Sequence, residues 1–318
     1  MPPAAPLSPA APAAPADDRI GLAVAVILGT VLALSLGDAL VKALAGGFAL
    51  GQIFLLRSLL ALPLLLWLMR ARRVPLWPVA LDWVALRSAL LVSMWIAYYL
   101  ALPHLDLSVA AAAYYTLPLF ITLFSGLLPG GRVAPLGWFA VALGFAGVLL
   151  ILRPGPEAFN LWALAPLCAA MLYAAAMLLT RARCRAEPPL TLALWLNLGF
   201  ILAGIAISVA SLALPGQGGF LFAPWAALDG PAWAALALMA VALVIGGVGA
   251  AFAYQNAPPA LIGAFDFAYV GFALLWGLLL FAEAPDAIAL SGIALIVLSG
   301  LLSLRAGRPA TPSPTAPL

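Results

Sequence analysis

Apolar residues fill long continuous stretches of this chain, separated by short clusters of proline, glycine and charged residues. A membrane-spanning helix needs about 20 predominantly apolar residues. Strands of a membrane barrel would instead alternate apolar and polar residues over about ten positions, and these runs do not alternate. The pattern predicts an all-α, polytopic membrane protein with ten transmembrane helices, over residues 20–45, 48–69, 78–101, 107–128, 134–152, 159–181, 190–213, 231–254, 259–281 and 286–304.

The composition agrees with this pattern and excludes both a soluble globular domain and a disordered chain. Of the 318 residues, 66% are hydrophobic and 8% are charged. A soluble domain carries about 25% charged residues, and a disordered chain lacks apolar residues. The Pro/Ala-rich ends, residues 1–18 and 306–318, are expected to be disordered, solvated tails. The single histidine, His104, leaves a His-based metal site without ligands, so we expect neither a metal nor another cofactor.

Basic residues concentrate on one side of the predicted helices. Loops on the cytoplasmic side of a membrane carry an excess of lysine and arginine. With the N-terminus in the cytoplasm, the cytoplasmic segments hold ten of the 14 basic residues: Arg19, Arg70, Arg72, Arg73, Arg132, Arg181, Arg183, Arg185, Arg305 and Arg308. We therefore expect a multi-pass protein of the cell inner membrane with both termini in the cytoplasm.

The two halves of the chain align with each other without a gap over their last two helices. A shift of 153 residues places Ser108-Val-Ala on Leu261-Ile-Gly, and Gly147 on Gly300. Any two segments rich in Leu, Ala and Gly align to some degree, but this match also fits the helix count. We expect five-helix repeats over residues 19–153 and 154–305. An odd number of helices inverts the second repeat, as in many secondary transporters.

Several short motifs follow one another along the chain. They are Gly37-Asp-Ala-Leu-Val-Lys42, Phe54-Leu-Leu-Arg57-Ser, Thr116-Leu-Pro118, Leu150-Ile-Leu-Arg153-Pro-Gly, Phe281-Ala-Glu283 and the stretch from Gly292 to Gly300. Their order and spacing resemble the drug/metabolite transporter superfamily, specifically its EamA-type members, over residues 20–305. Two positions depart from the family pattern. Gly130 is the repeat counterpart of Glu283, where the family often has an acidic residue, and Gly271 is the counterpart of Pro118.

The resemblance implies a secondary active transporter that moves small organic metabolites by alternating access. EamA-type proteins are often exporters of amino acids and related metabolites, which is our leading interpretation. Other members of the superfamily take up flat aromatic vitamins such as riboflavin, or nucleotide-like solutes, and no motif decides between these interpretations. The expected partners are a small-molecule solute, membrane lipid and protons as a candidate coupling ion. Neither nucleic acid nor an oligomer is required.

Two other classes of protein fit the sequence less well. An intramembrane enzyme is disfavoured because the chain has no HExxH motif, no GxSxG motif and no Cys/His pairing. We therefore expect no catalytic residue. A channel or assembly subunit is disfavoured by the inverted repeat. The chain also lacks a nucleotide-binding loop, so ATP is not expected to drive transport on this chain.

Charged residues inside apolar helices are the first candidates for the site, because each costs about 2.5–3.5 kcal/mol to insert. Asp38 and Lys42 are four residues apart, so they share a helix face and can pair. Arg57 lies about two turns into the next helix, and the three residues are expected to form one polar cluster in the outer third of the membrane. Such a cluster either fixes helix packing or contacts the solute.

Asp266 is the other outlier. It has no basic neighbour in its own helix, and Tyr269 follows three residues later on the same face. This carboxyl suits either a coupled proton or an amine-binding role, and the alternative is a protonated acid that hydrogen-bonds to a neighbouring helix. Arg87 is interpreted as structural, either reaching toward the cytoplasmic interface or pairing with Asp82.

Aromatic residues complete the candidate site. Trp95 and Tyr99 share one helix face, and Tyr115 shares a face with Pro118 and Thr122. A proline inside a membrane helix frees a backbone carbonyl, which is tolerated beside a neighbouring helix or a cavity. These rings either form the amphipathic wall of a pocket or pack in the ordinary way. The predicted solute-binding residues are Asp38, Lys42, Arg57, Trp95, Tyr99, Tyr115, Asp266 and Tyr269.

Overall fold

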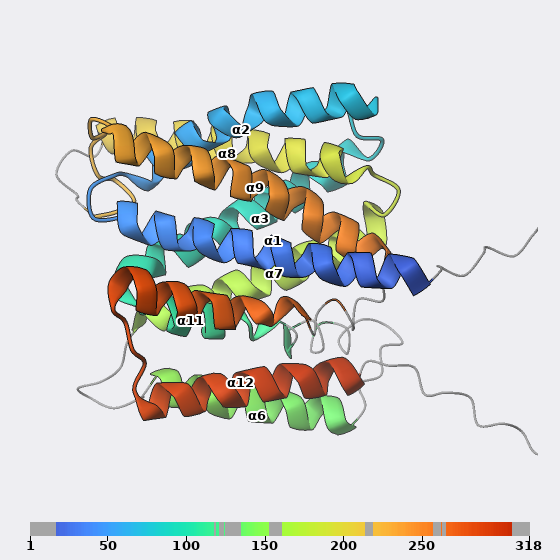
Figure 1. Cartoon of the computed structure of the whole chain (residues 1–318), viewed down its shortest axis with the longest axis vertical. Coiled ribbons are helices and arrows are strands. Elements are labelled where there is room, and N and C mark those ends of the chain that lie inside the picture. The colour runs from blue at the N-terminus through green and yellow to red at the C-terminus, as the bar shows by residue number, and fades with distance from the viewer. Residues whose placement is uncertain are drawn as a thin grey trace, which may run out of the picture.

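The computed structural model describes residues 17–117, 119–120, 124, 135–152, 161–213, 219–256, 262 and 265–306. These residues form helices, turns and loops and contain no strand, which confirms the all-α prediction (Figure 1). The α-helices are α1 (Asp17–Leu44), α2 (Leu50–Arg72), α3 (Leu81–Ala101), α4 (Leu107–Tyr114), α6 (Pro135–Leu152), α7 (Leu164–Arg183), α8 (Pro189–Ala213), α9 (Gly230–Asn256), α11 (Ala268–Phe281) and α12 (Ala287–Ala306). Two short 3-10 turns, η1 (Leu102–His104) and η2 (Leu161–Ala163), precede α4 and α7.

Each predicted apolar run overlaps one of these helices. Among the described residues, six helices are long and apolar enough to cross a bilayer: α1, α2, α3, α7, α8 and α9. Three further helices, α6, α11 and α12, have shorter apolar segments of 16, 14 and 16 residues. Parts of the predicted fourth and ninth helices lie outside the described residues, as do most of both predicted tails, Pro118, Thr122 and Gly130.

Local sequence explains several helix ends. Asp229 and Asp286 stand just before α9 and α12, and each accepts a hydrogen bond from a backbone amide of the first turn, Ala232 and Ala289 respectively. Such caps satisfy amides that have no partner inside the helix. The α11 helix ends at Ala282, whose left-handed backbone (φ 53°) turns the chain toward Glu283.

Helices from the two halves of the chain pack against each other in pairs. The most extensive contacts join α6 with α12, α1 with α9, α2 with α8, and α3 with α7, and α4 packs against α11. Glycine permits the closest approaches. A Cβ on Gly147 of α6 would lie 2.8 Å from the carbonyl oxygen of Gly292 in α12, and one on Gly204 of α8 would lie 2.7 Å from the backbone nitrogen of Leu55 in α2. Such contacts between small residues are typical of membrane helices.

The two ends of the bundle differ in charge. The loop after α2 contacts the turn between α7 and α8, because Thr191 donates to the carbonyl of Pro75 and the backbone amide of Ala80 donates to Glu187. This end, here called the basic end, carries Arg70, Arg72, Arg73, Arg183 and Arg185. The first residue of α1 and the last of α12 lie at the same end of the bundle (Figure 1). The opposite end, here called the acidic end, carries Asp106, Asp229, Glu283 and Asp286.

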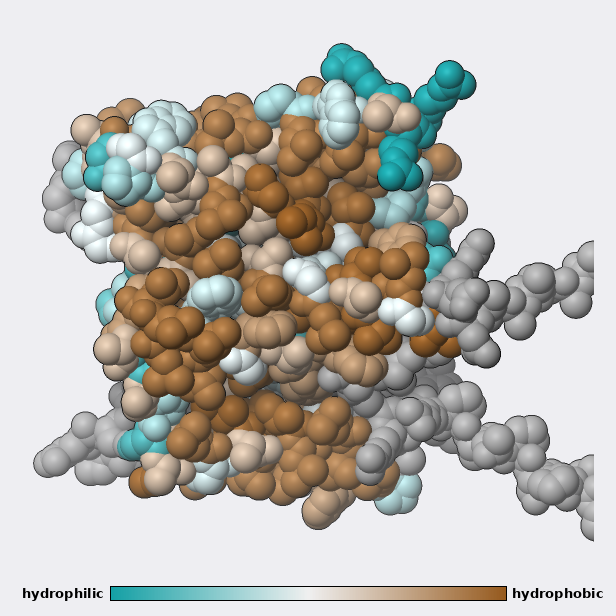
Figure 2. Space-filling view, in the orientation of Figure 1, coloured by the Kyte–Doolittle hydropathy of each residue, from teal (hydrophilic) through white to brown (hydrophobic). Residues whose placement is uncertain are grey.

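The sides of the bundle are apolar. In Figure 2 the visible face is mostly brown, and hydrophilic residues gather at its upper right, where α2 ends in Figure 1. Large exposed side chains include Trp67, Trp138, Phe145, Leu202 and Leu279. An apolar patch of this extent is unusual on a soluble monomer, whereas hydrocarbon chains of lipid would cover it in a bilayer.

Candidate functional site

A chain of hydrogen bonds lies at the centre of the bundle, around the carboxylate of Asp38 in α1. Tyr99 of α3 donates its hydroxyl to Asp38 Oδ1 at 2.9 Å, and Tyr269 of α11 donates its hydroxyl to Asp38 Oδ2. Arg57 Nη1 of α2 donates to the hydroxyl of Tyr99 at 3.0 Å. Asp38 is 1% exposed, so its burial is offset by two hydroxyl donors and, through Tyr99, by a guanidinium group.

The predicted pairing of Asp38 with Lys42 is wrong. Lys42 instead forms an ion pair with Glu283, which follows α11, and also donates to the carbonyl of Leu105. The other carboxylate oxygen of Glu283 accepts the backbone amide of Leu107 at 2.9 Å. The physical reason is reach. The long lysine side chain extends past the last turn of α1 to the acidic end, while Asp38 remains among tyrosine donors one turn deeper.

Arg57 is connected to Asp38 through Tyr99 and not through Lys42. Its guanidinium lies 4.7 Å from the ring centre of Phe54 and 4.6 Å from that of Phe200, which is the geometry of a cation–π contact. Its side chain does not line the cavity described below. Within the described residues, Nε and Nη2 of Arg57 have no hydrogen-bond partner. The predicted three-residue cluster is therefore divided, with Asp38 and Arg57 in one network and Lys42 in another.

A cavity of about 690 Å³ opens beside Asp38. Five of the eight predicted residues line it: Asp38, Trp95, Tyr115, Asp266 and Tyr269. Lys42, Arg57 and Tyr99 do not, although Tyr99 contacts Trp95 with ring centres 4.9 Å apart. The cavity thus brings together residues from α1, α3, α4 and the segment leading into α11, which no single helix pattern joins.

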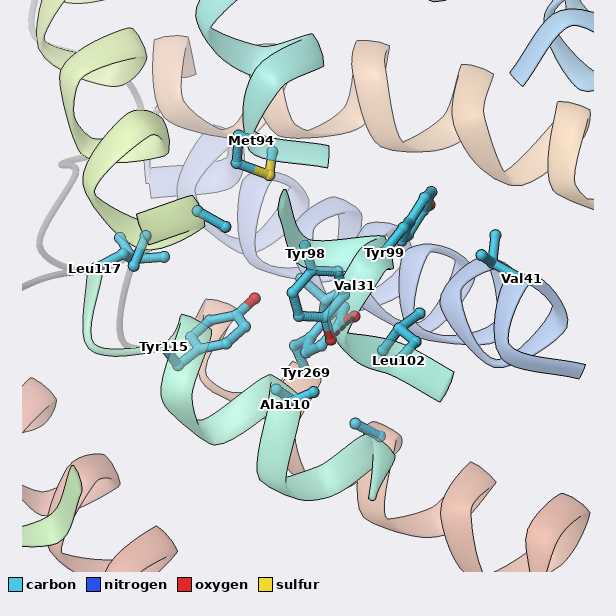
Figure 3. Close-up of a cluster of buried hydrophobic side chains, with 14 of the residues drawn as sticks. Val31, Val41, Met94, Tyr98, Tyr99, Leu102, Ala110, Tyr115, Leu117 and Tyr269 are labelled. Carbon is cyan, nitrogen blue, oxygen red and sulfur yellow. Dashed lines mark hydrogen bonds between the residues drawn. The ribbon is translucent and has the colours of Figure 1, made fainter. Parts of the chain in front are cut away.

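Aromatic rings make a continuous wall along this cavity. Tyr98, Tyr114 and Tyr173 line it as well, although helical spacing did not place them in the predicted site. The ring centres of Tyr98 and Tyr114 lie 5.4 Å apart, and those of Tyr114 and Tyr173 lie 5.7 Å apart. Figure 3 shows Tyr98 and Tyr269 close together with Tyr115 beside them. The rings of Tyr115 and Tyr269 are stacked, with centres 5.1 Å apart and planes 28° apart.

Asp266 lies two residues before the start of α11, and it has a partner that the sequence did not reveal. Tyr115, which directly follows α4, donates its hydroxyl to Asp266 Oδ1 at 3.2 Å. The shared face predicted for Asp266 and Tyr269 agrees with the structure, because both line the cavity. The predicted neighbours of Tyr115, Pro118 and Thr122, lie outside the described residues.

Arg87 of α3 differs from its sequence interpretation. It is 7% exposed, so it does not reach to the surface, and no ion pair with Asp82 is present among the described residues. Its Nε donates to the hydroxyl of Thr180 in α7 at 2.8 Å, and it lines the same cavity. The part of the chain that the structure describes contains no group of three His, Cys, Asp or Glu side chains that could hold a metal ion.

Sequence comparison with known proteins assigns the chain to a family. The chain is 33% identical to a riboflavin transporter of Rhizobium johnstonii over 221 residues, which cover 69% of this chain and 67% of that protein. The chain belongs to the same transporter family. It is also 23% identical to the pseudopaline exporter of Pseudomonas aeruginosa over 266 residues, covering 83% and 89% of the two chains. No family model matches the chain.

A solved crystal structure has the same fold. It covers 92% of this chain and 98% of its own, with a TM-score of 0.61 and 22% sequence identity. The identity is low, so this likeness shows the fold alone. The relatives show that the protein is a membrane transporter with a small-molecule solute.

The transporter's cavity extends toward one end of the bundle. Its lining continues past Thr180 to Cys184 and Arg185 at the basic end, and Arg185 is exposed. On α1 the lining residues stop at Asp38. One turn beyond Asp38, the Lys42–Glu283 ion pair joins α1 to the segment after α11. Beside that pair, partial burial and the nearby Glu283 carboxylate raise the pKa of Asp106, and Lys42 opposes this effect.

Proposed function

We propose that this transporter is an EamA-type member of the drug/metabolite transporter superfamily that moves a flat aromatic solute of the riboflavin type across the inner membrane. The observation that carries the proposal is the aromatic wall: Trp95, Tyr98, Tyr114, Tyr115, Tyr173 and Tyr269 all line one cavity. Aromatic rings favour offset-stacked or edge-to-face partners with centres about 4.5–7 Å apart. A planar heterocycle offers such a partner to several of these rings at once.

The size and polarity of the cavity also suit such a solute. Its volume of about 690 Å³ falls within the range of about 300–1,000 Å³ that is typical of small-molecule sites. The carboxylates of Asp38 and Asp266 each accept a tyrosine hydroxyl, and a carboxylate has about four acceptor positions. Hydroxyl groups on a sugar-like side chain would therefore find acceptors beside the rings. The 33% identity to a riboflavin transporter supports the same solute class.

The ten-helix inverted repeat belongs to this proposal. If the second half repeats the first, α7, α8, α9, α11 and α12 correspond to α1, α2, α3, α4 and α6. When the two halves are exchanged by this correspondence, the α1–α9 pair maps onto the α3–α7 pair. The α2–α8, α4–α11 and α6–α12 pairs each map onto themselves. This symmetry of contacts supports two inverted five-helix repeats, with the basic end in the cytoplasm. Cysteine reporters beside Arg72 and Arg183 should then react only with reagents added on the cytoplasmic side.

Alternating access is supported by the difference between the two ends of the cavity. The lining reaches exposed Arg185 at the basic end, while the Lys42–Glu283 pair and the Glu283–Leu107 hydrogen bond join both halves at the acidic end. The described conformation therefore corresponds to a state open to the cytoplasm. Transport requires the opposite state, in which the Lys42–Glu283 pair separates and the basic end closes.

Export of an amino acid or a related metabolite is the second candidate function. The specific observation in its favour is that the cavity holds Arg87 together with the carboxyls Asp38 and Asp266, which would match a zwitterion. The similarity to the pseudopaline exporter supports this function over a larger share of the chain. In either case Asp266 is our candidate for carrying a coupled proton, since it faces the cavity and accepts a neutral donor, the hydroxyl of Tyr115.

Solute flux in proteoliposomes tests the proposed function. Radiolabelled riboflavin and a labelled aromatic amino acid are compared, with vesicles either empty or preloaded so that uptake and export are separated. Trp95→Leu should lower riboflavin flux about tenfold, the equivalent of about 1.4 kcal/mol, because Trp95 lines the cavity. The matched control is Trp138→Leu, at a side chain 52% exposed on α6. Equal flux in the two variants, or flux of the amino acid alone, would refute the riboflavin-type proposal.

A further inference from the structure

Arg87 lines the cavity, and one of its buried hydrogen-bond donors has no partner among the described residues. Its Nε is fixed by Thr180, whose own hydroxyl donates to the carbonyl of Ala176 at 2.7 Å. Its Nη1 is buried and has no partner among the described residues. An unsatisfied buried donor on a charged group destabilises the protein, so the position calls for an acceptor that the described residues do not provide.

The charge of Arg87 is also unbalanced locally. The ion pair found among the described residues joins Lys42 to Glu283 at the acidic end, and Glu187, on the turn after α7, is engaged with the backbone amide of Ala80. Tyr173, Cys184 and Asp266 line the same cavity as Arg87. None of the ion pairs found among the described residues joins Arg87 to a carboxylate.

From this geometry we infer that Arg87 is the subsite for an anionic oxygen group of the solute, a carboxylate or a phosphate. The inference rests on the proposed transport of an aromatic solute and makes it more specific. The planar guanidinium is held through Nε by Thr180, lines the cavity and keeps Nη1 without a protein acceptor among the described residues. The fork of a guanidinium suits carboxylate and phosphate oxygens. Such a bond to a charged acceptor is about twice as strong as a neutral one.

The rest of the cavity fits a solute of this kind. An anionic group at Arg87 would leave the aromatic part of the solute against Tyr114 and Tyr173, which line the adjoining wall. Donor groups at the other end of the solute would then meet Asp38 and Asp266. Arg185, at the exposed end of the cavity, adds a second positive charge on the path by which an anion enters from the basic end.

Flavin binding tests the subsite, because riboflavin and riboflavin 5′-phosphate differ by one anionic group. Binding to the purified protein is measured by quenching of flavin fluorescence. The wild type should bind the phosphate about tenfold more tightly than riboflavin, and Arg87→Gln should bring the ratio of the two affinities to about one. Arg183→Gln is the matched control, because this exposed arginine at the end of α7 contacts Trp83 and does not line the cavity.

A second measurement separates failure of the subsite from failure of the proposed function. Inorganic phosphate and benzoate, probes for the phosphate and carboxylate sources of the anion, should each raise the thermal stability of the wild type and of Arg183→Gln but not of Arg87→Gln. This arm needs no flavin binding. If neither flavin binds while the anions still act through Arg87, the riboflavin-type proposal fails and the subsite stands. If Arg87→Gln keeps the stabilisation by both anions, the subsite is overturned.

Discussion

Replacing Glu283 by glutamine should shift the transporter toward the state that is open at its acidic end. Glu283→Gln keeps the size of the side chain and removes the charge that pairs with Lys42. A conformational equilibrium moves only by the energy that one state gains and the other lacks. The Lys42–Glu283 pair closes the end opposite to the cavity opening. We therefore expect the pair to stabilise the described state and not the state that is open at the acidic end.

The size of this shift follows from the burial of the pair. Removing one partner of a buried ion pair costs about 3–5 kcal/mol, whereas an exposed pair is worth about 0–1 kcal/mol. The side chains of Lys42 and Glu283 are 12% and 16% exposed, and the glutamine can still accept the amide of Leu107. We therefore take about 2 kcal/mol as the loss. At about 1.4 kcal/mol per factor of ten, the equilibrium should move about 30-fold.

Cysteine accessibility measures the shift. Cys168 and Cys184 are first replaced by serine, and Ala251→Cys then serves as the reporter, because Ala251 is half-buried and lines the cavity. Glu283→Gln should slow labelling by an impermeant maleimide in vesicles that expose the basic end. Asp229→Asn is the control, since it removes a charge from the same end but retains a residue suited to capping α9.

Two outcomes would refute the reasoning. Labelling rates for Glu283→Gln within about twofold of the parent protein would mean that the pair persists in both states or contributes nothing to the equilibrium. Equal slowing of labelling by Asp229→Asn would mean that loss of any negative charge at the acidic end has this effect, and that the Lys42–Glu283 pair is not its cause. The exchanged pair, Lys42→Glu with Glu283→Lys, should restore the parent rate at least in part, because the opposite charges again meet at the acidic end.

Three further predictions concern packing, charge and coupling. Gly147→Ala should destabilise the protein by about 1–3 kcal/mol through overpacking against α12, while Gly29→Ala, with nothing within 4 Å of its added Cβ, should be neutral or stabilising in thermal-shift measurements. Asp106 has a raised pKa in the folded protein, so its ionised form costs stability. Asp106→Asn should therefore raise the melting temperature at neutral pH, and the gain should vanish as the pH falls below the ordinary value of about 3.9. Asp266→Asn should fold and exchange solute but lose pH-driven accumulation in proteoliposomes, and unchanged accumulation would show that Asp266 carries no coupled proton.

Much of the fold could be predicted because each membrane helix follows from one continuous apolar stretch of the sequence. An apolar run can satisfy its backbone in lipid only as a helix or a closed barrel, so run length and continuity are nearly sufficient. The predicted run 134–152 became α6, Pro135–Leu152, and the run 286–304 became α12, Ala287–Ala306. Helix α7 begins at Leu164 instead of residue 159, because a 3-10 turn occupies Leu161–Ala163.

The site was predicted less completely, because its members come from different helices. A spacing of three or four residues correctly predicted that Trp95 and Tyr99 lie side by side and that Asp266 and Tyr269 line one cavity. Tyr99 itself does not line that cavity. Tyr98 and Tyr114 lie next to predicted residues and line the cavity, a position that helical spacing assigns to another face. Only the surrounding helices α1, α7 and α11 determine that both faces meet the same cavity.

The wrong pairing of Asp38 with Lys42 shows why charge spacing is a weak guide inside a helical bundle. A pair four residues apart on a helix is worth about 0.2–0.5 kcal/mol, whereas a hydrogen bond to a charged group contributes about 1.5–3 kcal/mol. Asp38 gains two such bonds, from Tyr99 and Tyr269, and Lys42 gains the carboxylate of Glu283. Contacts with neighbouring helices therefore stabilise each of these charges more than contacts within its own helix would. The same comparison makes Arg57 and Arg87 conspicuous, because the described parts of the neighbouring helices leave buried donors of both guanidinium groups unsatisfied. Of these two residues, Arg87 lines the cavity and Arg57 does not.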